Sequence, residues 1–166
     1  IVIAAKNAET LRIINDKIRD HELTKRYLCI TLGAPRPPAG EVENFLRKDE
    51  KKKQVFVFHK PVPGAKTAVT RYKTLQRRGE LALVEVELLT GRTHQIRATM
   101  ADLGCPLLGD GKYGNGEKNR GYGETRQALY SYQLTFDLPT DAGILNYLRG
   151  RTFQVDGVPF REKYFG

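Results

Sequence analysis

The sequence predicts an α+β fold, with a mixed, largely antiparallel sheet and flanking helices. Three observations predict it: strand-like segments are numerous, most of them are joined by connections short enough for hairpins, and helical periodicity is convincing in only two places. Residues 1–166 are expected to form a single domain, because this length suffices for one hydrophobic core and no linker or internal repeat divides it.

The N-terminal part is expected to contain a strand, a helix and a second strand. Residues 1–5 are apolar and mostly β-branched, as in the second half of a buried strand. Because the chain also begins without methionine, we expect a fragment of a longer protein. Asn7 can cap a helix that continues to about residues 20–22. Aromatic and branched residues then predict a strand over 27–32, ended by Gly33 and nearby prolines.

Four further strands are expected before the second helix. The charge run at 48–53 is typical of a solvated loop, and an RNA contact there is the alternative. Alternating or aromatic-rich patterns place the strands at residues 40–46, 55–58, 66–75 and 81–89.

The remaining third of the chain is expected to contain a loop, a strand, a short helical piece and a hairpin. Glycine-rich, polar composition predicts a mobile loop at 115–123. The other elements are a strand at 126–136, a helical turn or two at 144–148, and a hairpin of 152–155 with 158–164 about Asp156-Gly157.

Composition favours a globular protein with a polyanionic partner. The net charge is +9 and the isoelectric point is near 9.6, as in many proteins that bind nucleic acid. No apolar run approaches the length of a membrane span, and the first residues lack the pattern of a secretory signal. Cys29 and Cys105 are isolated and lack metal-type spacing, which predicts reduced thiols in a cytoplasmic protein.

The most informative turn joins the strand at 81–89 to the second helix. Apolar residues recur at helical spacing over 96–103, and Gly104 follows where a helix is expected to end. The hydroxyl of Thr90 or Thr93 can cap the start of this helix.

Basic side chains crowd the first turns of this helix. Arg92, His94 and Arg97 lie where free backbone N–H groups already favour anions. By itself this pattern indicates either phosphate or carboxylate binding, or an ordinary solvated helix start with His94 hydrogen-bonded to nearby backbone.

The full string is more specific than its parts. TGRTHQIR at 90–97 is followed by GCPLLGD at 104–110 and by Tyr113-Gly114. This combination resembles the signature of the RluA-type family of RNA pseudouridine synthases, and the resemblance covers essentially the whole chain. It implies a sheet-centred catalytic domain that isomerises uridine to pseudouridine in structured RNA, ribosomal or transfer. It also implies RNA as the partner and a reaction without metal or organic cofactor.

The resemblance assigns the catalytic positions by their motifs. Lys25-Arg26-Tyr27 matches a Lys-x-Tyr string, which implies that Tyr27 faces the extruded uracil and that Lys25 lies beside the site. Without the resemblance, the same residues indicate only a strand start with a half-buried tyrosine and solvated bases. Arg97 is implied to pair with the nucleophilic aspartate, so Arg97→Met is expected to impair catalysis with little loss of folding.

Further residues are implied to surround the target base. Leu129 matches the family's apolar pocket wall, while Arg92, His94 and Gln95 are implied to contact RNA backbone or to support the loop. Basic residues expected on the same side of the cleft are Arg92, Lys112, Lys118 and Arg120.

The family's nucleophile itself has no match in this sequence. It belongs to a His-Arg-Leu-Asp string just upstream of the strand that corresponds to residues 1–5, and the chain contains no such string. Asp110 is expected to stabilise a turn rather than to replace it. We therefore expect an inactive fragment of the catalytic domain. The alternative is a non-catalytic RNA-binding module of the same fold.

Overall fold

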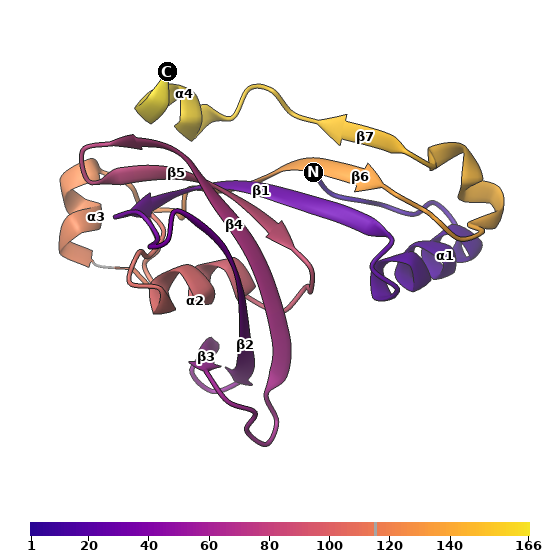
Figure 1. The fold of residues 1–166 in the computed structure, drawn as a ribbon, viewed down its shortest axis with the longest axis horizontal. Helices are drawn as coiled ribbons and strands as arrows, with labels where there is room; N and C mark the ends of the chain where they lie inside the picture. Colours follow the sequence, from indigo (N-terminus) through magenta and orange to yellow (C-terminus); the bar gives the residue numbers. More distant parts are fainter. Residues whose placement is uncertain (115) are drawn as a thin grey trace.

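The computed structural model describes residues 1–114 and 116–166. Its centre is one seven-stranded sheet in the order β3-β2-β4-β5-β1-β6-β7, and each neighbouring pair is antiparallel (Figure 1). The predicted α+β class with a largely antiparallel sheet is thereby confirmed. The strands are β1 (Leu23–Leu32), β2 (Ala39–Asp49), β3 (Gln54–Phe58), β4 (Lys66–Arg78), β5 (Leu81–Leu88), β6 (Leu129–Phe136) and β7 (Arg151–Gln154).

Short helices cover both faces of this sheet. In Figure 1, α2 and α4 lie on opposite sides of the strands, and α1 lies below the N-terminal end of β1. None of the helices in the described part of the chain is long and apolar enough to cross a membrane. The helices are α1 (Ala8–Arg19), α2 (Gln95–Asp102), α3 (Gly116–Tyr122), α4 (Pro159–Phe165) and the 3₁₀ helix η1 (Gly143–Leu148).

The central strand β1 is buried on both faces where the helices cover it. Successive side chains of a strand point to opposite faces, so Cys29 packs with Ile96 and Met100 of α2, while Leu28 and Ile30 belong to the cluster beneath α4. This double cover explains the uninterrupted run of buried residues at 28–32, apolar except for Thr31, which a strand with one solvated face would not need.

The first helix begins where the sequence predicts. The Asn7 side chain accepts a hydrogen bond from Thr10 N at 2.8 Å, as an N-cap residue should, and α1 ends at Arg19. Ile14 packs with Leu134 and Phe136, so α1 covers the end of β6.

The strand expected at residues 1–5 is wrong. This segment has no strand structure, and Val2 to Ala4 are exposed. It meets the sheet through a hydrogen bond of 2.6 Å from the Ile1 amine to Ser131 O and through packing of Ile1 against the cluster of Leu134 and Phe136. A strand needs a ladder of such bonds, and no ladder follows here.

The loop expected at 115–123 is also wrong over most of its length, because residues 116–122 form α3. Asn115 lies outside the described residues. A buried side chain explains the helix: Asn119 accepts a hydrogen bond from Gly109 N at 2.9 Å and donates one to Asp110 O at 3.3 Å. These tertiary contacts overcome a composition that by itself favours a loop.

The C-terminal hairpin is the third correction. The strand β7 pairs with β6, and the residues after Asp156-Gly157 form α4 instead of a second strand. Pro159 occupies the first helical position, where its missing N–H costs nothing. Phe160 and Tyr164 lie one turn apart on the face that packs on the sheet, so helical spacing was the overlooked signal.

Candidate active site

Tyr27 and Arg97, 70 positions apart in the sequence, line one pocket. It has a volume of about 330 Å³ and opens between the end of β5, the start of α2 and β6. We call it the Tyr27 pocket. Its lining residues are Tyr27, Leu88, Arg92, His94, Gln95, Ile96, Arg97, Gln127 and Leu129.

Tyr27 is held by the strands on either side of β1. It lies opposite Val86 of β5 and Ser131 of β6, and its ring packs against the cluster formed with α2. Leu88 and Leu129 add apolar walls to the same pocket. The Tyr27 hydroxyl makes no hydrogen bond to the described residues, so it is available to a bound molecule.

Arg97 is engaged by a carboxylate of this chain. Its Nε lies 2.7 Å from Asp110 Oδ2 and its Nη2 lies 2.8 Å from Oδ1, a two-pronged pair that fixes the guanidinium plane. Asp110 also accepts hydrogen bonds from Lys112 N and Tyr113 N, at 2.9 and 3.1 Å. The predicted turn role of Asp110 is confirmed, but the prediction missed its pairing with Arg97.

The Asp110 carboxylate is buried and held ionised. Burial alone would raise its pKa, but the hydrogen bonds from Arg97 and from the Tyr113 and Lys112 amides lower the pKa below its usual value. Its side chain is 0% exposed. With both oxygens occupied and no exposure, Asp110 cannot attack a ligand in the Tyr27 pocket.

The Nη1 group of Arg97 is not used in the pair with Asp110. Nη1 makes no hydrogen bond within the described part of the chain, and Arg97 lines the Tyr27 pocket. The hydrogen bond with Asp110 raises the pKa of Arg97, and its guanidinium carbon lies 5.1 Å from the centre of the Tyr113 ring. Arg97 can therefore hold Asp110 and accept a second carboxylate in the pocket.

Gln95 supports the loop before α2. The side chain is buried: Nε2 donates to Val69 O and to Thr70 Oγ1, both at 3.0 Å. Its Oε1 accepts from Thr90 Oγ1 and from Arg92 N, both at 2.9 Å. These four bonds use the full capacity of the amide, so loop support, rather than contact with RNA, is the role that the geometry leaves to Gln95.

The expected threonine cap of α2 is wrong. His94 occupies the N-cap position in the left-handed backbone region, with φ of 52°, and makes no side-chain cap bond. The Thr90 hydroxyl is used elsewhere, because it accepts from Val69 N at 2.9 Å and donates to Gln95. The Thr90 hydroxyl therefore links the loop after β5 to β4 and to Gln95, and it does not cap the helix.

The His94 side chain is hydrogen-bonded to a side chain and not to backbone. Its Nδ1 lies 3.0 Å from Tyr113 Oη, and Tyr113 Oη accepts a hydrogen bond from Val55 N at 2.8 Å. The tyrosine proton is then free to go to Nδ1, which leaves the imidazole proton on Nε2. Burial and the nearby charges of Arg97 and Lys112 lower the pKa of His94.

We expect His94 to be neutral at pH 7, with a pKa below 6.5, in a titration followed by nitrogen-detected NMR of the imidazole. Because folding lowers the pKa of His94, the contribution of neutral His94 to the free energy of unfolding is complete above the pKa of the unfolded state. It is lost as the pH falls through the pKa of the folded state. Tyr113→Phe should weaken the preference for the Nε2-protonated form. A His94 pKa above 6.5 would contradict the hydrogen-bond assignment.

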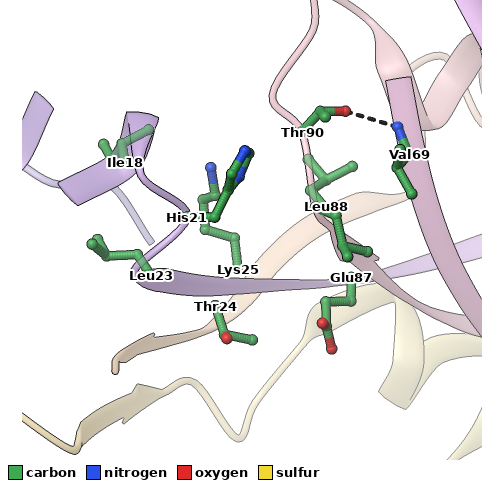
Figure 2. Close-up of a pocket in the computed structure, with 10 residues that line it drawn as sticks. Ile18, His21, Leu23, Thr24, Lys25, Val69, Glu87, Leu88 and Thr90 are labelled. Carbon is green, nitrogen blue, oxygen red and sulfur yellow. Dashed lines mark hydrogen bonds between the residues drawn. The ribbon is translucent and has the colours of Figure 1, made fainter. Parts of the chain in front are cut away.

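The predicted basic residues are not all gathered at the pocket. Arg92 lines it, with Nε donating to Thr67 O at 2.9 Å. Lys25 does not: it lines the neighbouring pockets near α1, one of which is shown in Figure 2. Lys112, Lys118 and Arg120 are not among the lining residues, and their expected position on the cleft side stays a prediction.

The pocket is basic and apolar. Within the described residues, its lining includes no aspartate or glutamate, and no group of three histidine, cysteine or acidic residues is placed to hold a metal ion. A flat aromatic ring, two leucines and an arginine suit an uncharged planar base next to an anionic group.

Comparison with known proteins gives the family. The family model described as RNA pseudouridylate synthase matches residues 1–102. The ribosomal large subunit pseudouridine synthase D of Borreliella burgdorferi is 33% identical over 138 residues, which are 83% of this chain and 41% of that protein. YhcT of Bacillus subtilis, an uncharacterized RNA pseudouridine synthase, is 35% identical over 135 residues, which cover 80% of this chain and 42% of that protein.

A solved structure shows the same fold. Human RNA pseudouridylate synthase domain containing 1 superposes with a TM-score of 0.74 at 20% identity, covering 92% of this chain and 62% of that one. The chain spans less than half the length of the two bacterial relatives. Since the family model matches more than half of its residues, and the TGRTHQIR string lies at the pocket, the chain belongs to the RNA pseudouridylate synthases, in their RluA-type branch.

Proposed function

We propose that the protein converts specific uridines to pseudouridine in structured RNA, ribosomal or transfer. The nucleophile is an aspartate supplied by a part of the longer protein that precedes residue 1. The observation that carries this proposal is the Tyr27 pocket, where an unpaired arginine N–H, a free tyrosine hydroxyl and apolar walls meet without a carboxylate. The family match over residues 1–102 supports the same reaction class.

The reaction balances without a cofactor because substrate and product are isomers. The bond from N1 of uracil to the ribose breaks, the base turns, and a bond from C5 to the same ribose carbon forms. The proton on C5 is removed and N1 gains one. The target nucleotide must first leave its stack to enter the pocket.

Each residue of the pocket has a distinct part in this proposal. Arg97 Nη1 holds the incoming aspartate ionised and oriented, while Asp110 fixes the guanidinium from behind. The Tyr27 ring stacks on the uracil and its hydroxyl helps remove the C5 proton. Leu129 closes the apolar wall. His94 has its neutral Nε2–H to donate to the RNA.

In the longer protein, we expect Tyr27→Phe to lower kcat about 100-fold or more, while KM changes little. Phenylalanine keeps the stacking surface and removes only the hydroxyl. Tyr27→Leu should lower kcat and also raise KM, because the ring is lost. Steady-state rates over a range of cognate RNA concentrations measure both effects. Full turnover by Tyr27→Phe would restrict Tyr27 to stacking.

The function is tested by release of tritium from C5-labelled uridine in total cellular RNA, with the longer natural protein as the enzyme. We expect release that stops at a fixed number of sites per RNA. If the longer protein releases no tritium from any cellular RNA yet still binds RNA, the chain is a non-catalytic RNA-binding module, and the catalytic proposal is wrong.

A further inference from the structure

A groove runs from the Tyr27 pocket along the start of β1. Two pockets of about 360 and 370 Å³ share Ile18, His21, Lys25, Leu89 and Thr90. We call these shared residues, together with Arg92, the Lys25 groove. Arg92 lines both the 360 Å³ pocket and the Tyr27 pocket, so the groove continues directly from the proposed position of the target base.

Lys25 is a half-buried cation without a counter-ion. Its Nζ makes no hydrogen bond or ion pair with the described residues, and burial lowers the pKa of Lys25. In Figure 2, Lys25 and Thr24 leave β1 on opposite sides, and the Lys25 amine lies beside the His21 ring. A methyl group placed on Gly91 would lie 3.7 Å from Nζ, so the amine also borders the TGRTHQIR turn.

The other charges around the groove are already balanced. Arg19 is paired with Asp16 and Asp20, at 2.9 and 3.2 Å. Glu87, which lines the pocket of Figure 2, is paired with Arg26 and Arg71, at 3.2 and 3.0 Å.

Arg92 is the second uncompensated cation. Among the described residues, its side chain donates one hydrogen bond, from Nε to the uncharged carbonyl of Thr67. An isolated charge that is partly removed from water is costly unless an ion of opposite sign accompanies it. This cost falls on half-buried Lys25. Arg92 is exposed and adds a second positive charge that no carboxylate neutralises, so the groove favours an anion.

We propose that the Lys25 groove binds a backbone phosphate of the RNA next to the target nucleotide, through Lys25 and Arg92. This inference rests on the proposed function, since the adjoining pocket would hold the extruded uridine. A nucleotide chain places a phosphate within one residue of each base, so an anion beside a base pocket fits RNA. The site is sequence-independent, because a lysine and an arginine recognise phosphate charge and not base edges.

The test compares Lys25→Met, Lys25→Arg and Lys73→Met with the unaltered chain. Lys73 is the control: it is an exposed strand lysine without an ion pair among the described residues, and it leaves β4 on the face opposite to buried Tyr72. The probe is a nine-nucleotide oligouridylate, with binding measured by fluorescence anisotropy over a range of salt concentrations. Thermal unfolding confirms that each variant is folded.

We expect the slope of log K against log salt to fall in magnitude by about 0.7 for Lys25→Met, as for the loss of one phosphate contact on a single strand. Lys25→Arg and Lys73→Met should keep the original slope. An equal slope for Lys25→Met and the unaltered chain would overturn the inference while leaving the proposed function intact. So would an equal decrease for Lys25→Met and Lys73→Met.

A second probe, inorganic phosphate, distinguishes a site for RNA backbone phosphate from a site for free phosphate. It should shift the Gly91 amide resonance of the unaltered chain and not that of Lys25→Met. If phosphate shifts Gly91 but oligouridylate does not bind, the groove is a site for free phosphate, and both the RNA inference and RNA binding by this chain are wrong. If neither probe shifts Gly91, the Lys25 groove is not an anion site.

Discussion

Residues 1–166 alone are expected to form no measurable pseudouridine, with turnover at least about 10⁴-fold below that of the longer protein. The reason is the composition of the Tyr27 pocket. Arg97, Tyr27 and Leu129 line it, and no aspartate or glutamate is among its lining residues in the described part of the chain. Orientation and proton transfer cannot replace the bond that a nucleophile forms. Tritium release from C5-labelled uridine, run on both proteins together, measures the difference.

A matched control accompanies this experiment. Binding of oligouridylate by residues 1–166 should persist, because Arg92 and Lys25 belong to this chain. Turnover by residues 1–166 within tenfold of the longer protein would mean that a carboxylate present here acts as nucleophile. Asp110 is paired with Arg97 of the pocket, but it is buried and fully hydrogen-bonded, so such a result would contradict the geometry described above.

The second large effect concerns stability. Asp110→Asn is expected to lower the free energy of unfolding by about 3–5 kcal/mol, because it leaves the guanidinium of Arg97 without its buried partner. Arg97→Met should cost a similar amount, since Asp110 would then be a buried charge without compensation. The expectation that Arg97→Met leaves folding nearly intact has to be revised for this reason. Urea unfolding of each variant measures the loss.

The double variant Arg97→Met/Asp110→Asn tests whether the cost comes from the pair. It should be more stable than the sum of the single losses predicts, by about 1–3 kcal/mol, because neither charge remains buried alone. Additive losses, or single losses below about 1 kcal/mol, would show that the pair is not the stabilising contact. The Leu46→Ala variant, in a separate apolar cluster, provides a control for simple loss of packing.

The same pair predicts a pH dependence. Because folding lowers the pKa of Asp110, its contribution to stability is complete above the unfolded value of about 3.9 and disappears as the pH falls through the lower folded value. The difference in unfolding free energy between the unaltered chain and Asp110→Asn should therefore shrink in acid. A constant difference down to pH 2 would contradict an ionised Asp110.

Local chemistry was sufficient where a residue acts on its neighbours along the chain. Asn7 caps α1, Gly104 follows α2 in the left-handed region with φ of 75°, and alternating residues form β4 and β5. These signals depend on hydrogen bonds and side-chain directions within a few residues, so they are visible in the sequence. The family string likewise marked the turn that forms the pocket.

Composition failed where a distant contact outweighed local preference. The glycine-rich segment after Gly114 forms α3 because Asn119 is hydrogen-bonded to Gly109 and Asp110. The helix α4 forms where its aromatic side chains pack against the sheet. Neither contact follows from the residues of the segment itself, since tertiary packing supplies most of the stability of short helices.

The sequence by itself determined the α+β class, the family, and the pocket residues Tyr27, Arg97 and Leu129, because motif spacing records which residues are used together. Only the tertiary structure decided their partners. It joined Arg97 to Asp110, turned Gln95 inward as a support, and placed Lys25 in a groove beside the pocket instead of within it. The physical reason is that ion pairs and buried amides are satisfied through space, by whichever strand or turn the folded chain brings within hydrogen-bond distance.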